Sequence, residues 1–139
     1  MVASGTENQP LPASFDLDST AQYLSGSYMV IGKAADSNRL YQGQVSIRYT
    51  GHNQFVVRRR IGSSIVLATG FFAVASPPPD QPVVFRVRFQ EGRQEYEATY
   101  LWKSDLDNYA RLTGYVYLRQ GNTKSPGLET LFPAPALKR

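Results

Sequence analysis

The hydrophobic and polar residues of segment 39–62 alternate with a period of two, which is the pattern of a β-strand with one buried face. One set of alternate positions holds Tyr41, Gly43, Val45, Ile47 and Tyr49, and the other holds Gln42, Gln44, Ser46 and Arg48. After the turn-forming residues 50–53, the alternation resumes with Phe55, Val57 and Ile61. The segment therefore predicts a β-hairpin with one face toward water.

Similar patterns along the chain predict seven or eight strands. Besides the hairpin, we expect strands at 26–33, 65–75, 83–90, 95–102, 109–118 and, as a short last strand, 128–132. The short connections favour antiparallel pairing of consecutive strands. Because curling removes the exposed edges of such a sheet, we predict an all-β fold, an antiparallel up-and-down barrel of about eight strands. An open, bent sheet whose free face is buried in a dimer is the alternative.

The two ends of the chain differ from the strand region. Residues 1–17 contain two prolines and few large apolar side chains, which predicts a flexible leader. Asp18 or Ser19 is a suitable N-cap for a short helix that plugs one end of the barrel. We therefore expect a leader at 1–17, one barrel domain at 18–133 and a C-terminal tail at 134–139.

Composition removes several classes of chemistry. The 139 residues include no cysteine and one histidine, His52, in a predicted turn. Disulfides, thiolate catalysis and zinc sites with cysteine ligands are thereby excluded, and a histidine triad is disfavoured. The sequence has no phosphate-binding loop, dinucleotide fingerprint or nucleophile elbow. We expect no cofactor and no metal site.

Charge and hydropathy bear on location and partners. The formal net charge is +4, yet residues 1–32 carry three acidic residues and no basic one, so the strand region is the basic part. No run of about 18 apolar residues occurs, so no transmembrane helix is predicted. The small and polar residues 3–10 are typical of the start of a mature exported protein. We expect an exported or periplasmic protein, with a cytoplasmic location left open.

Glycine and aromatic spacings carry a family resemblance. The motifs are Gly26-x-Tyr28, Tyr41 to Ile47, Phe55 to Gly62, Leu112-x-Gly114 and Gly127 to Pro133. They resemble small exported bacterial β-barrel proteins of the lipocalin-like (calycin-like) type, over residues 26–133. The lipocalin signature has tryptophan where Tyr28 stands, and an avidin-like pocket needs several tryptophans where this chain has only Trp102. The resemblance implies a barrel and no particular ligand.

Arg59 is the most informative candidate residue. If Phe55, Val57 and Ile61 face the interior, the same period turns Arg59 inward as well. An unpaired charge there costs several kcal/mol, so Arg59 needs a partner. One interpretation is an anchor for a carboxylate or phosphate at the barrel mouth. The other is structural: an internal salt bridge, for instance to Glu97, or a bulge that turns the side chain to solvent.

Aromatic residues with polar tips complete the candidate site. Such side chains line pockets, but they also form stabilising pairs across strands. Our candidate ligand-binding residues are Arg59, Tyr96, Glu97, Tyr100 and Trp102. For an enzyme, the alternative role, Arg59, Glu97 and Tyr100 would form an acid/base cluster at the mouth.

Five arginines are expected on the outer surface: Arg48, Arg58, Arg60, Arg86 and Arg88. With exposed tyrosines they would suit nucleic acid or anionic lipid headgroups. Arginines that alternate along strands are also the ordinary polar face of an antiparallel sheet, so nucleic-acid binding is the less favoured interpretation.

The sequence thus favours a non-enzymatic binding or interaction module of an exported bacterial protein. Its partner would be a small apolar or amphipathic ligand inside the barrel, or a protein at the sheet face. The alternatives are an enzyme at the barrel mouth and a structural domain that forms a homodimer. An open interior with converging polar groups favours a ligand or a substrate, whereas a filled core favours an interaction or structural role.

Overall fold

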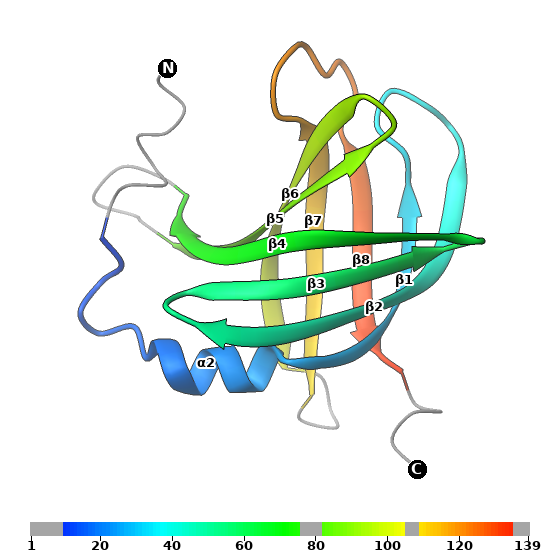
Figure 1. The fold of residues 1–139 in the computed structure, drawn as a ribbon. Coiled ribbons are helices and arrows are strands. Elements are labelled where there is room, and N and C mark those ends of the chain that lie inside the picture. Colours follow the sequence, from blue (N-terminus) through cyan, green and yellow to red (C-terminus); the bar gives the residue numbers. More distant parts are fainter. Residues whose placement is uncertain (1–9, 76–81, 105–108, 135–139) are drawn as a thin grey trace.

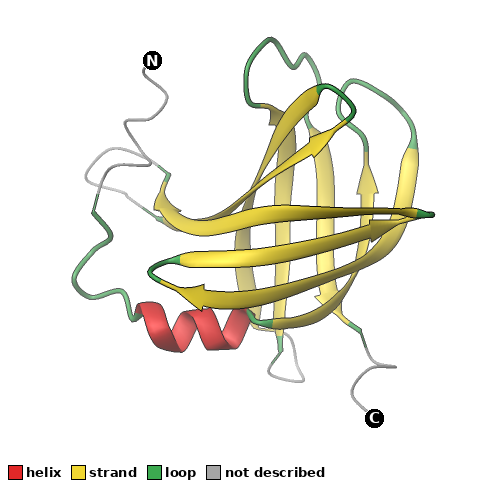
Figure 2. Cartoon of the chain, in the orientation of Figure 1, coloured by secondary structure: helices red, strands yellow, loops and turns green. Residues whose placement is uncertain are grey.

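The computed structural model describes residues 10–75, 82–104 and 109–134. Within these residues, helix α2 (Leu17–Leu24) precedes the strands (Figure 2). The strands are β1 (Gly26–Lys33), β2 (Leu40–Gly51), β3 (Gln54–Ile61), β4 (Ser64–Val74), β5 (Val83–Glu91), β6 (Gln94–Ser104), β7 (Ala110–Leu118) and β8 (Gly127–Pro133). No helix in this part of the chain has both the length and the apolar character needed to cross a bilayer.

The strands form a closed barrel (Figure 1). Each strand pairs antiparallel with its neighbours in sequence, and the first strand pairs with the last, so that Val30 of β1 lies opposite Leu131 of β8. Closure satisfies the backbone groups that an open sheet would expose at its edges. The predicted eight-stranded up-and-down barrel is confirmed, and the alternative of an open sheet is wrong.

The interior follows the predicted alternation of side chains. The six apolar residues that best define it are all buried in one core: Val45, Ile47, Phe55, Val57, Phe85 and Val87. Toward α2 the interior is filled by aromatic rings, with the centroid of Phe55 lying 5.4 Å from Phe72 and 4.9 Å from Phe85. The barrel is therefore not an open tube.

Helix α2 and the residues before it lie at one end of the barrel (Figure 1). The N-cap is Asp16, whose carboxylate accepts a hydrogen bond from the Ser19 backbone N–H at 3.1 Å, so the prediction of Asp18 or Ser19 as the cap was wrong. Residues 1–9 of the expected leader lie outside the described residues. Within its described part, Phe15 packs edge-on against Phe72, with ring centroids 5.0 Å apart.

Candidate functional site

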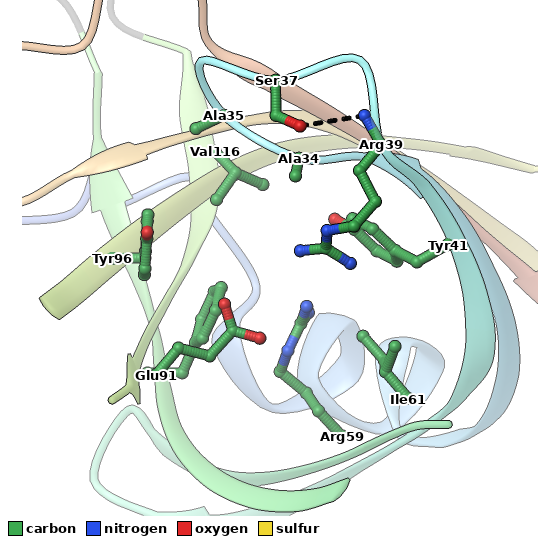
Figure 3. A pocket seen from close by; sticks show the side chains of 11 residues that line it. Ala34, Ala35, Ser37, Arg39, Tyr41, Arg59, Ile61, Glu91, Tyr96 and Val116 are labelled. Atoms are coloured by element: carbon green, nitrogen blue, oxygen red, sulfur yellow. Dashed lines mark hydrogen bonds between the residues drawn. The ribbon is translucent and has the colours of Figure 1, made fainter. Parts of the chain in front are cut away.

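The end of the barrel opposite α2 holds a cavity of about 140 Å³. We call it the mouth cavity. It lies where the β1–β2 connection meets the ends of the strands, and Figure 3 looks into it. Its polar and aromatic walls come from Arg39, Tyr41, Arg59, Phe89, Glu91 and Tyr96, and small or aliphatic side chains complete the lining. Aromatic walls with a few charged groups are the usual composition of a small-molecule site.

Arg59 lies beside this cavity and is paired with Glu129. The two side chains come from β3 and β8, which are not neighbours in the sheet, so they meet across the barrel interior. The guanidinium donates from Nη1 to Oε1 at 3.1 Å and from Nη2 to Oε2 at 2.6 Å. Arg59 is 4 % exposed and Glu129 is 1 % exposed. This two-point contact lets a buried cation and a buried anion compensate each other.

Two tyrosines complete the environment of Glu129. The Tyr41 hydroxyl donates to Oε2 and the Tyr100 hydroxyl donates to Oε1, both at 2.5 Å. With the two bonds from Arg59, the carboxylate accepts four hydrogen bonds, which is about its full capacity. We call Arg59, Glu129, Tyr41 and Tyr100 the interior network. Because Glu129 is saturated, it is poorly placed to take a proton from a bound molecule.

The pKa values of the interior network follow from burial and from this pairing. Burial alone would raise the pKa of Glu129. The positive charge of Arg59 and the hydrogen bonds donated by Arg59, Tyr100 and Tyr41 outweigh burial and hold that pKa below its usual range. Burial alone would lower the pKa of Arg59, and the Glu129 carboxylate outweighs it and raises that pKa. Burial and the nearby carboxylate raise the pKa of both Tyr41 and Tyr100. The network is thus an ion pair with two neutral phenols.

A glycine makes room for this network. Gly114 of β7 lies opposite Tyr100 on one side and Glu129 on the other. A Cβ atom at this position would lie 2.2 Å from the Thr99 carbonyl oxygen and 2.8 Å from the Tyr100 ring. A side chain of any size at position 114 would therefore displace the strand or the tyrosine.

Two arginine side chains, Arg59 and Arg39, line the mouth cavity. The Arg59 Cζ atom lies 4.1 Å from the centroid of the Phe89 ring, a cation–π contact in the cavity wall. Arg39 points its guanidinium into the cavity from the rim, with Cζ 5.8 Å from the Tyr41 ring centroid (Figure 3). Among the described residues, no carboxylate lies within ion-pair distance of Arg39. Its charge is therefore available to a bound anion.

The predicted site residues fall into three places. Arg59 and Tyr96 line the mouth cavity, and Tyr100 joins Arg59 through Glu129. Trp102 lies toward α2, with its ring 5.5 Å from Phe72 and 6.5 Å from Phe15. The structure therefore places Trp102 away from the mouth.

Glu97 also lies apart from Arg59. It is on the outer face of the barrel, where its carboxylate accepts a hydrogen bond from Arg88 Nε at 2.8 Å. The suggested Arg59–Glu97 salt bridge was wrong, because Arg59 is paired with Glu129 instead. The acid/base cluster of Arg59, Glu97 and Tyr100 is consequently not assembled.

Sequence reasoning missed Glu129 and the rim residue Arg39. Glu129 lies in a strand where Leu128 and Phe132 alternate with Glu129 and Leu131, so both faces carry apolar side chains and the period does not say which one is buried. No signal in the sequence chose between these faces; in the structure Leu131 is buried, and the period of two turns Glu129 inward with it. In the described ranges, no three His, Asp or Glu side chains come together to hold a metal ion.

The chain was compared with models of protein families, with curated proteins and with solved structures. No match was found in any of the three comparisons. The eight-stranded antiparallel barrel with one short helix is consistent with a lipocalin-like fold. A functional argument for this chain therefore rests on its own geometry.

Proposed function

We propose that the protein is a binding module for a small, planar, negatively charged molecule, which it holds in the mouth cavity. One observation carries this proposal: the guanidinium groups of Arg39 and Arg59 converge on a cavity whose walls include three aromatic rings (Figure 3). Guanidinium groups recognise carboxylates and phosphates, and aromatic walls favour flat, conjugated ligands.

The size of the cavity limits the ligand. A cavity of about 150 Å³ accepts a molecule the size of benzene, and the mouth cavity measures about 140 Å³. The rings of Phe55, Phe72 and Phe85 pack together toward α2, and none of them is part of the cavity lining. A ring with one small acidic substituent fits this limit better than the long apolar ligand that a hollow barrel would hold.

The charges of the lining favour an anion with a donor at its far end. Glu129 neutralises Arg59, while no described carboxylate lies within ion-pair distance of Arg39. Glu91 is exposed at the rim and points into the cavity from the side that faces Arg39 (Figure 3). An acidic group directed at Arg39, with a hydroxyl directed at Glu91, would match both side chains.

Titration with benzoate, followed by ligand-observed NMR and calorimetry, tests this proposal. We expect benzoate to bind and benzamide, which has the same shape without the charge, to bind at least tenfold more weakly, since a hydrogen bond to a charged group contributes about 1.5–3 kcal/mol. Arg39→Gln should weaken benzoate binding by a similar factor. Lys103→Gln, which removes an exposed charge near the opposite end of the barrel, should leave it unchanged.

Three results would overturn the proposal. The first is equal binding of benzoate and benzamide, and the second is no binding of either. The third is benzoate binding that Arg39→Gln does not change, because the anion would then lie elsewhere.

A second candidate role, a homodimer, is favoured by the outer face of β6, β7, β8 and β1. Four large apolar side chains are exposed there, with threonines between them: Ile31, Leu101, Tyr115 and Leu128. Two copies of this face would bury these apolar side chains against each other, with the exposed Lys103 and Arg111 toward one end of it. Light scattering at tens of micromolar protein tests this role, and a monomer at that concentration excludes it.

A further inference from the structure

The outer face of β2, β3 and β4 combines exposed arginines with exposed aliphatic side chains. In the register of β3 and β4, Arg58 lies opposite Leu67 and Arg60 lies opposite Ile65. Leu67 is 69 % exposed and Ile65 is 53 % exposed. Side chains directly opposite each other on one face of a sheet have Cβ atoms about 5 Å apart. With Arg48 on β2, these five residues form one surface, which we call the arginine face.

The arginine face has no compensating negative charge. Residues 37–79 contain five arginines and no Asp or Glu. Among the described residues, no carboxylate lies within ion-pair distance of Arg48, Arg58 or Arg60. Arg88 on the next strand, β5, differs, because it is paired with Glu97 and stacks on the Phe71 ring. The arginine face therefore carries a concentrated positive charge that is open to solvent.

The aliphatic side chains indicate which polyanion fits this surface. Proteins that bind single-stranded nucleic acid place bases on exposed aromatic rings. The exposed apolar groups of the arginine face are instead Ile65 and Leu67, which offer no ring for stacking. Basic residues beside aliphatic side chains suit the boundary between lipid headgroups and acyl chains, where the cations meet phosphates and the apolar groups leave water.

The surface beside Arg60 also has a shape suited to a headgroup. A shallow hollow there is lined by Met29, Gln42, Gln44 and Arg60. The two amides and the guanidinium of this lining are hydrogen-bond donors, the groups that bind a phosphate.

We propose that the arginine face docks the barrel on a bilayer surface that contains anionic lipids. Arg48, Arg58 and Arg60 contact the headgroup phosphates, while Ile65 and Leu67 enter the interface between headgroups and acyl chains. The mouth cavity is a separate site, so this docking does not depend on the proposed small ligand.

Vesicle sedimentation with the full chain tests the docking. We expect binding to vesicles of phosphatidylcholine with phosphatidylserine, little binding to phosphatidylcholine alone, and weaker binding as salt screens the charges. Arg58→Gln with Arg60→Gln should weaken binding by about tenfold or more, since each arginine near an anionic surface contributes about a fivefold factor. Arg93→Gln with Lys103→Gln removes the same charge from other surfaces and should have a small effect.

A second pair of variants distinguishes a membrane from other polyanions. Ile65→Ser with Leu67→Ser keeps every charge, so it should weaken vesicle binding severalfold while leaving any binding to a single-stranded oligonucleotide unchanged. Circular dichroism confirms that each variant is folded.

Three results would overturn the proposal. The first is no preference for phosphatidylserine, and the second is an equal loss in the two charge-removing pairs. The third is oligonucleotide binding tighter than vesicle binding together with no effect of the Ile65 and Leu67 substitutions, which would assign the face to nucleic acid.

Discussion

At Glu129 a single substitution should have a large effect on the free energy of unfolding. A buried ion pair costs desolvation on both sides, and only good geometry with additional hydrogen bonds compensates for that cost. Here Arg59 supplies two bonds and the tyrosines supply two more. The pair is thus tolerated in the interior because every acceptor site on the carboxylate is used.

We predict that Glu129→Ala lowers the free energy of unfolding by about 3–5 kcal/mol, because it leaves the Arg59 charge buried without a partner. Urea unfolding followed by circular dichroism measures this loss. Glu95→Ala is the matched control, since Glu95 makes an exposed pair with Arg119 at 3.4 Å and should cost less than about 1 kcal/mol. Equal losses in the two variants would contradict the account of the interior network.

A double substitution separates charge from packing. Arg59→Met combined with Glu129→Met removes both charges and keeps most of the volume, so it should be more stable than Glu129→Ala. It should remain below the parent protein, because the hydroxyls of Tyr41 and Tyr100 lose their acceptor. A double variant less stable than Glu129→Ala would mean that the charges are not the dominant cost.

Sequence periodicity was informative for some elements and ambiguous for others. Polar and apolar residues alternate along β2, and the same period continued into β3 places Phe55 and Val57 inward, so the inward position of Arg59 followed from them. In β8 both faces carry apolar side chains, so the inward position of Glu129 did not follow. The helix start was missed because Asp16, Asp18 and Ser19 are all good N-caps; the structure uses Asp16, which directly follows the packed Phe15.

At the level of a strand, Gly114→Ala tests the space that β7 leaves for the interior network. We expect a loss of about 1–3 kcal/mol in unfolding free energy, because the added methyl group overlaps the Thr99 carbonyl and the Tyr100 ring. Chemical denaturation measures the loss. Thr113→Ala, on the outward side of the same strand, should change stability far less, and a similar loss there would point to strand propensity instead.

At the helix end, Phe15→Ala should expose the only tryptophan. The Phe15 ring packs against Trp102 and Phe72, so its removal should shift the Trp102 emission to longer wavelength and cost about 1–2 kcal/mol, since Phe15 is only half-buried. Leu40→Ala removes an exposed side chain at the mouth and should change neither the Trp102 emission nor the stability. An unchanged emission in Phe15→Ala would show that this segment does not cover the barrel end.

For the whole molecule, the raised pKa values of buried tyrosines predict unfolding in alkali. Burial raises the pKa of Tyr28, Tyr41 and Tyr100, so the folded chain holds protons that the unfolded chain releases near pH 10. Their contribution to stability is complete below about pH 10 and is lost as pH rises further.

Tyrosinate absorbance measured together with circular dichroism checks this prediction. These three of the nine tyrosines should ionise only as the barrel unfolds. Ionisation of Tyr28, Tyr41 and Tyr100 before any loss of structure would contradict it.

Architecture was more predictable than the site across the whole chain. Alternation and short connections were enough to predict a closed antiparallel barrel with one shared core. The partner of Arg59 was not predicted, because Glu129 lies on a strand that meets β3 only across the interior. Which side chains face each other there depends on barrel curvature and stagger, which strand patterns do not encode. Export and the identity of a ligand remain predictions.

The placement of the interior anion on the last strand has a consequence for biosynthesis. The ribosome synthesises Arg59 long before residue 129. A nascent chain that ends after β7 therefore has Arg59 without its counterion Glu129, and strand β1 without its pairing partner β8. Folding should therefore finish only after the C-terminal segment has emerged, and products that stop short of β8 should be recognised as incomplete by cellular proteases.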